Sequence, residues 1–319
     1  MFTRIRSVIK ATILEVVSEP LFFLLTITAV SVLTTASLLH VHQFGEVSRM
    51  ARDIALSSLL IFGIIFSIFA SIRVFRREIE SGTLQMALSR PISREVFFIS
   101  KVTGIFLGYA IFFIIVFLAS ITTVVGSEVA KIHSEIVTAS HVCGSGNENF
   151  LPETLWGVSL AVNVSIVVLP LIVGAVLNRF FRFRFTTTAF IIAFFISIAG
   201  CLLNILLANH MFHNRMISVY DLVVRLLPVG FLLIIPTSLF VFLAAALSVR
   251  LKDNVVASLS SMFFIVFIPA FGNYYQTQAI AKGGELSWLY VLNAFFASLP
   301  LIVAFLILGT YLIKNKDVG

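Results

Sequence analysis

Charged residues are scarce in this chain. Only 12% of its 319 residues are Asp, Glu, Lys or Arg, whereas 59% are hydrophobic and the mean hydropathy is +1.07. A soluble domain carries about 25% charged residues, so this composition excludes an ordinary soluble fold. The net charge of +7 would suggest a nucleic-acid partner in a soluble protein. Here the basic residues mostly flank apolar runs, so membrane topology explains them better and we expect no nucleic acid.

Metal-binding and disulfide motifs are also lacking. The two cysteines, Cys143 and Cys201, do not make a disulfide framework, and neither falls in a metal motif. His210 and His213 have the i, i+3 spacing that could place two ligands on one helix face, but no third ligand is nearby. We therefore expect no metal site and no cofactor held by this chain.

Two further absences concern the source of energy. The chain has no Gly-x-x-x-x-Gly-Lys-Ser/Thr motif, so it is not expected to bind ATP by that route. No Asp, Glu, Lys or Arg lies in the middle of an apolar run, which argues against catalytic residues, an intramembrane enzyme and an ion-coupled carrier. Asn163, Asn204 and Asn293 are the main polar exceptions. They could line a substrate path, although hydrogen bonding between helices is the commoner use.

What the chain does have is eight apolar runs. Each is long enough to cross a hydrocarbon core of about 30 Å at about 1.5 Å per residue. We predict an all-α, polytopic transmembrane helical bundle of about eight spans (six to eight), forming a single domain over residues 1–319. The seventh run is the shortest and could be re-entrant. The runs cover residues 21–39, 54–72, 96–126, 155–177, 187–208, 226–249, 255–272 and 287–313.

The distribution of basic residues predicts the orientation of these spans. With the N-terminus inside, sixteen of the 22 Lys and Arg residues fall in inner segments and six in outer ones. Positively charged loops stay on the cytoplasmic side, so this asymmetry supports eight spans with both termini in the cytoplasm. We expect a multi-pass protein of a cell membrane, with the bacterial cytoplasmic (inner) membrane as the simplest setting.

Residues 1–19 form a separate segment before the first run. Their apolar positions recur on one side of a helix, next to three basic residues, which is typical of an interfacial helix. A secretory signal is the alternative. Glu15 and Glu19 interrupt its apolar pattern and no convincing cleavage site follows, so we expect an anchor that is not cleaved.

Residues 127–154 are predicted to be the longest external loop, with a possible short helix before Gly144. A loop of this length tends to have a function or to be mobile. It could gate an exit path, contact an extracytoplasmic partner, or be a solvated connector.

The segment Arg73–Gly104 joins the second and third runs and holds six basic residues. Within it, residues 83–89 are a short helix candidate that Pro91 ends, and Leu84 and Leu88 share one face of this helix. Such an element could lie on the membrane surface or fit a groove on a partner. Basic charge and helical periodicity alone do not distinguish this segment from a cytoplasmic loop of any other polytopic protein.

The order of motifs in this segment closely resembles the signature of ABC type-2 permeases, the membrane subunits of ATP-driven exporters. The matching elements are Glu78-x-Glu80-x-Gly82-Thr83-Leu84, then Leu88-Ser89-Arg90-Pro91-Ile92-Ser93-Arg94, then Lys101 and Gly104. The rest of the chain agrees only in layout. The family usually has six spans, so eight is a departure that leaves the position of a substrate pathway open.

The resemblance implies that residues 76–94 are a cytoplasmic coupling helix docked on a separate ATPase subunit, which holds ATP and Mg. It implies two ATPase copies under two permeases, either identical or paired with a relative, in contact with membrane lipid. It leaves the cargo open. A scaffold that passes force to an extracytoplasmic partner is the alternative. The residues assigned to ATPase coupling are Arg76, Arg77, Glu78, Glu80, Gly82, Thr83, Leu84, Leu88, Pro91 and Arg94.

Overall fold

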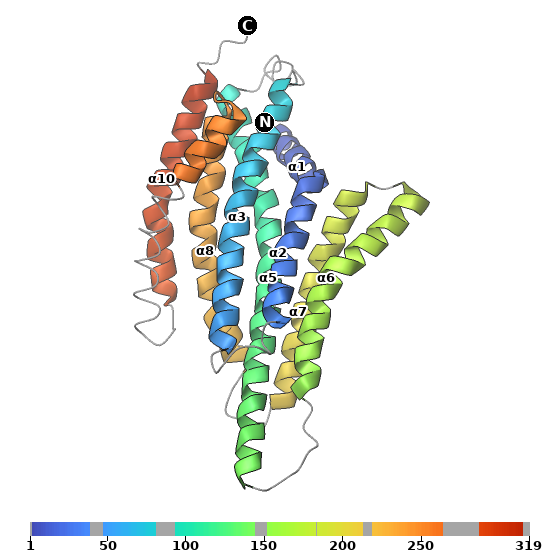
Figure 1. The fold of residues 1–319 in the computed structure, drawn as a ribbon. Helices are drawn as coiled ribbons and strands as arrows, with labels where there is room; N and C mark the ends of the chain where they lie inside the picture. The colour runs from blue at the N-terminus through green and yellow to red at the C-terminus, as the bar shows by residue number, and fades with distance from the viewer. Residues whose placement is uncertain are drawn as a thin grey trace. The chain divides into compact units, whose positions relative to one another are not determined.

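The computed structural model describes residues 2–38, 47–80, 93–143, 152–182, 184–212, 219–263 and 287–314. Apart from short links, these residues are helical, as predicted (Figure 1). Residues 253–263 form one helix. The others are α1 (Phe2–Ser18), α2 (Pro20–Leu38), α3 (Val47–Glu80), α5 (Arg94–Cys143), α6 (Pro152–Phe181), α7 (Phe185–Phe212), α8 (Val219–Ser248) and α10 (Trp288–Lys314).

Six of the described helices are long and apolar enough to cross a membrane, namely α3, α5, α6, α7, α8 and α10. The bent pair of α1 and α2 would make a seventh span. Helices suit this role because all of their backbone hydrogen bonds are made within one segment. The prediction of a polytopic bundle with six to eight spans is confirmed. The predicted run at 255–272 is helical up to residue 263, and its remainder lies outside the described residues.

A sharp break separates α1 from α2. The two helices meet at an angle of 60°, and Pro20 occupies the first position of α2. Proline is tolerated there but cannot continue a preceding helix, because it has no backbone N–H. The predicted N-terminal helix is therefore present as a separate element. Its location at a membrane interface stays a prediction.

The region predicted as an external loop is mostly a continuation of α5. The helix runs without interruption to Cys143, and α6 begins at Pro152. Residues 127–143 contain neither glycine nor proline, and Gly144 is the first residue that favours a helix end. The loop prediction therefore underestimated the helical part, because polar composition alone does not end a helix.

The chain divides into two compact units. Unit 1 comprises Met1–Phe22, Gly63–Ile111 and Pro228–Gly319, and unit 2 comprises Phe23–Phe62 and Phe112–Leu227. Unit 1 has an aromatic core in which offset and tilted rings pack between helices. Its ring pairs include Phe22–Phe66, Phe66–Tyr109, Phe75–Phe98 and Phe106–Phe242.

Two glycines allow α1 to approach α5 closely in unit 1. A Cβ atom added to Gly104 would lie 2.6 Å from the Cβ of Thr12, and one added to Gly108 would lie 2.9 Å from the Cγ1 of Val16. Residues four apart share one helix face. The Gly104 and Gly108 pair therefore forms a flat surface on α5, as small residues do where membrane helices pack.

Hydroxyl groups set the register of α3 against α8 in the same unit. Ser67 donates a hydrogen bond to the backbone oxygen of Thr237 at 3.1 Å, and Ser71 donates to that of Val241 at 3.1 Å. The hydroxyls of Tyr109 and Thr237 are also hydrogen-bonded. Because both serine contacts recur every four residues, sliding one helix along the other would break them together.

Unit 2 is held together by buried asparagines. Asn163 on α6 accepts a hydrogen bond from Thr122 at 2.6 Å and donates one to Thr123 at 2.8 Å, both on α5. Asn204 on α7 donates to Ser159 on α6 at 2.7 Å. These two asparagines therefore bond between helices, the commoner of the two uses considered. The antiparallel helices α6 and α7 lie side by side (Figure 1).

Candidate functional site

The two ends of the predicted coupling segment belong to helices. Helix α3 continues to Glu80, so Arg76, Arg77 and Glu78 lie on its last turns, and Arg94 begins α5. The predicted second span at 54–72 is thus shorter than the helix that contains it. The side chain of Glu80 lies outside the described part of the structure, as do Gly82, Thr83, Leu84, Leu88 and Pro91.

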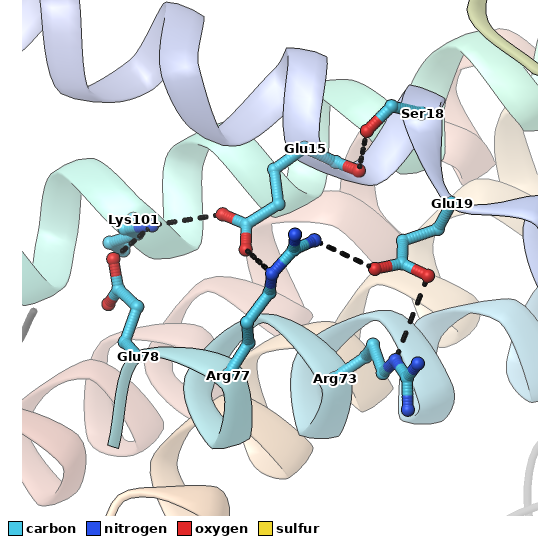
Figure 2. A network of polar contacts seen from close by, with 7 residues as sticks. All are labelled: Glu15, Ser18, Glu19, Arg73, Arg77, Glu78 and Lys101. Carbon is cyan, nitrogen blue, oxygen red and sulfur yellow. Dashed lines mark hydrogen bonds and ion pairs between the residues drawn. The ribbon is translucent and has the colours of Figure 1, made fainter. Parts of the chain in front are cut away.

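An ionic network connects the end of α3 to the end of α1 (Figure 2). Arg77 lies 3.0 Å from Glu19 and 4.0 Å from Glu15, and Arg73 lies 3.7 Å from Glu19. Arg73 and Arg77 are four residues apart and share one face of α3. They meet Glu15 at the end of α1 and Glu19 in the link that follows it.

Lys101 extends the network from α1 to α5. Its ammonium group lies 3.3 Å from Glu15 and 2.5 Å from Glu78, and its side chain is only 6% exposed. A lysine is almost never buried unless it is paired, because removing its charge from water costs several kcal/mol. Two carboxylates from two other helices surround this ammonium group, so Lys101 ties α1 and α3 to α5.

The network is balanced in charge and lies in unit 1. Such balance matters because an ion pair out of water stabilises a fold only when each charge is compensated. The close approach of α1 to α5 at Gly104, one turn beyond Lys101, holds the same two helices together beside the network. Its six charged members are Glu15, Glu19 and Glu78 against Arg73, Arg77 and Lys101.

Further contacts hold the segment's two ends to other helices of unit 1. Arg76 lies 3.6 Å from Asp253, on the helix at 253–263. Arg94 donates a hydrogen bond to the backbone oxygen of Lys314 at 3.3 Å, and Lys314 lies 3.9 Å from Glu95. These groups are well exposed, so each contact contributes little on its own. Together they connect the ends of the 76–94 segment to α10 and to the helix at 253–263.

Arg77 and Glu78, which the sequence analysis assigns to an ATPase contact, make ion pairs within the chain. Their proposed docking role stays a prediction. Glu15, Glu19 and Asp253 were not predicted to belong to a site. The available signal was the presence of two acids, four residues apart, in the otherwise basic and apolar segment 1–19.

Within the described part of the chain, no three His, Cys, Asp or Glu residues come together in a way that could hold a metal ion. The side chains of His210 and His213 lie outside that part. Comparison with protein-family models, curated proteins and solved structures finds no match to this chain. Its long apolar helices make it a helical, multi-pass membrane protein of a transporter-like type.

Proposed function

We propose that this chain is the permease subunit of an ATP-driven transporter and that a separate ATPase subunit docks on residues 76–94. The permease acts in pairs, with an identical copy or a relative, over two ATPase copies that hold ATP and Mg. Its termini face the cytoplasm, and transport is outward. The resemblance of the motifs between Glu78 and Gly104 to those of ABC type-2 permeases supports this proposal.

The observation that carries the proposal is the anchoring of both ends of the segment. On one side, Arg77 and Glu78 are ion-paired to α1 and α5. On the other, Arg94 and Glu95 contact α10. When both ends of a segment are fixed to helices, a force on the segment moves those helices. A loop without such contacts would change its own conformation instead. The ionic network is therefore suited to pass a displacement from a docked subunit into α3 and α5.

The mechanism that follows is mechanical. ATP binding closes the ATPase dimer and shifts the docked segment. Because Lys101 bridges α1 and α3 to α5, the three helix ends move as one piece. The membrane pathway between two permeases then opens to the opposite side. In this proposal, nucleotide binding and hydrolysis belong to the ATPase subunit.

The test uses the full-length protein purified with its companions from its own membrane. We expect a protein with a phosphate-loop motif in stoichiometric amount, and ATP hydrolysis that rises when transport substrate is present. The double variant Leu84→Asp, Leu88→Asp removes the apolar contacts proposed for docking. We expect it to lose the companion protein and the associated ATP hydrolysis.

The matched control is Leu84→Met, Leu88→Met, since apolar exchanges of similar volume usually cost less than about 1.5 kcal/mol. It should retain both properties. The docking role would be wrong if the aspartate variant kept a fully active ATPase. The whole proposal would be wrong if the purified chain transported substrate without any nucleotide-hydrolysing protein.

A second candidate function is a scaffold that transmits force without moving cargo. The length of α5 favours it. The helix has 50 residues and ends at Cys143, which makes it about 75 Å long at about 1.5 Å per residue, whereas a hydrocarbon core is about 30 Å thick. A rigid helical arm could act on an extracytoplasmic partner. Deleting residues 129–150 should then abolish function while ATP turnover persists, whereas a transporter should retain transport.

A further inference from the structure

The turn between α6 and α7 combines exposed positive charge with exposed aromatic rings. Arg179, Arg182 and Arg184 are all exposed. Between the first two lie Phe180, which is 75% exposed, and Phe181, which is 67% exposed. Both rings lie at the last two positions of α6. The turn therefore offers a charged and an apolar surface side by side.

The positive charge of this turn is not neutralised within the described residues. No ion pair joins any of the three arginines to a carboxylate among them. The sequence explains why, because no Asp or Glu occurs between Glu153 and Asp221. Arg184 also directly precedes α7, where the helix dipole favours negative charge. Its position is thus unfavourable unless an anion lies nearby.

The backbone of the turn adds a second observation. Arg182 has φ of 56°, in the left-handed region, and its N–H donates to Asn178 at the end of α6. Glycine is the usual residue at such a helix end, because it has no Cβ to clash there. An arginine at this place costs backbone energy that glycine would not. A ligand bound by the guanidinium group would offset this cost and explain why arginine occupies the position.

We propose that the turn binds the headgroups of anionic phospholipids. Guanidinium groups recognise phosphate through paired hydrogen bonds, and aromatic rings anchor helix ends at the membrane interface. The turn follows a helix long and apolar enough to cross the membrane, so the two phenyl rings can reach the acyl region while the arginines reach the headgroups. An acidic protein surface would use the charge but would leave the phenyl rings without a role.

Native mass spectrometry of the detergent-purified full-length protein tests this. Phosphatidylglycerol is the anionic probe and phosphatidylcholine the neutral one. We expect selective binding of phosphatidylglycerol that weakens as salt rises. Each basic residue near an anionic lipid surface contributes about five-fold in affinity, so Arg179→Gln, Arg184→Gln should weaken binding roughly 25-fold. The matched control, Arg250→Gln, Lys252→Gln, loses the same charge at an exposed site and should bind normally.

A second variant separates binding from folding. Arg182→Gly removes a guanidinium and relieves the backbone strain, so it should bind phosphatidylglycerol about five-fold more weakly while its melting temperature stays level or rises. Equal binding of the two lipids would overturn the proposal, as would an equal loss in the Arg250 and Lys252 control. It would also be overturned if Arg179→Gln, Arg184→Gln bound lipid normally but released a companion protein, which would indicate a protein contact instead.

Discussion

Replacing Lys101 by methionine is the sharpest test of the ionic network. Methionine keeps most of the length of the side chain and removes its charge. The ammonium group that the largely buried carboxylates of Glu15 and Glu78 share would then be lost. Removing one partner of a buried ion pair costs about 3–5 kcal/mol, because the remaining charge is uncompensated. We expect a loss of this size in the free energy of unfolding.

Arg73→Met is the matched control, since Arg73 belongs to the same network but its side chain is 67% exposed and lies 3.7 Å from Glu19. Glu19 keeps the closer Arg77 at 3.0 Å, so losing this longer contact to an exposed arginine should cost about 0–1 kcal/mol. The assay is thermal unfolding of the purified protein in lipid nanodiscs. At about 2 °C per kcal/mol, Lys101→Met should lower the melting temperature by roughly 6–10 °C, and Arg73→Met by about 2 °C or less.

The double variant Lys101→Met, Glu78→Gln completes the test. If the cost of Lys101→Met comes from stranding a buried carboxylate, removing that charge should recover part of the stability. The double variant should therefore lose less than the sum of the two single variants. Strict additivity, or equal melting temperatures for Lys101→Met and Arg73→Met, would refute the assignment of Lys101 as the buried bridge between α1, α3 and α5.

Three other predictions concern the packing of each unit. Gly104→Ala should cost about 1–3 kcal/mol, because the added methyl has no room, whereas Gly157→Ala, which meets nothing within 4 Å, should gain up to about 1 kcal/mol in thermal unfolding. Asn163→Leu breaks two interhelical hydrogen bonds and should cost about 1–2 kcal/mol in the same assay; an unchanged melting temperature would contradict this. In a Cys143→Ser background, buried Cys201 should react with a water-soluble maleimide only after unfolding, and rapid labelling of the native protein would argue against its burial.

The spans were predictable because the amino-acid composition of a segment is enough to indicate a membrane-spanning helix. A run of about twenty apolar residues in lipid has few options other than a helix, since every backbone polar group must find its partner internally. The boundary between the 1–19 segment and the first run was also predicted, and the structure places Pro20 there, at the start of α2. At residues 127–143 the sequence predicts only a possible short helix before Gly144 within a polar loop, whereas α5 continues through the whole stretch. Helix ends are decided by glycine, proline and capping residues, and the first of these is Gly144.

The candidate site was predictable only in part. Lys101 and the charged end of α3 were singled out from the sequence, but their partners were not. Glu15 and Lys101 are 86 residues apart, and Glu19 and Arg77 are 58 apart. No local pattern links residues at such separations. The docking leucines Leu84 and Leu88 rest on sequence alone, because they lie outside the described part of the chain.

The sequence by itself determined that this protein is helical, that it spans a membrane several times, and which loops carry the positive charge. These properties depend on the solvation of single segments, and a linear chain displays them directly. Only the tertiary structure decided that the charges at the end of α3 pair with α1 and α5, and that Gly104 and Gly108 receive α1. Pairing depends on which helix faces meet in space, and that is a property of the packed bundle rather than of any one helix.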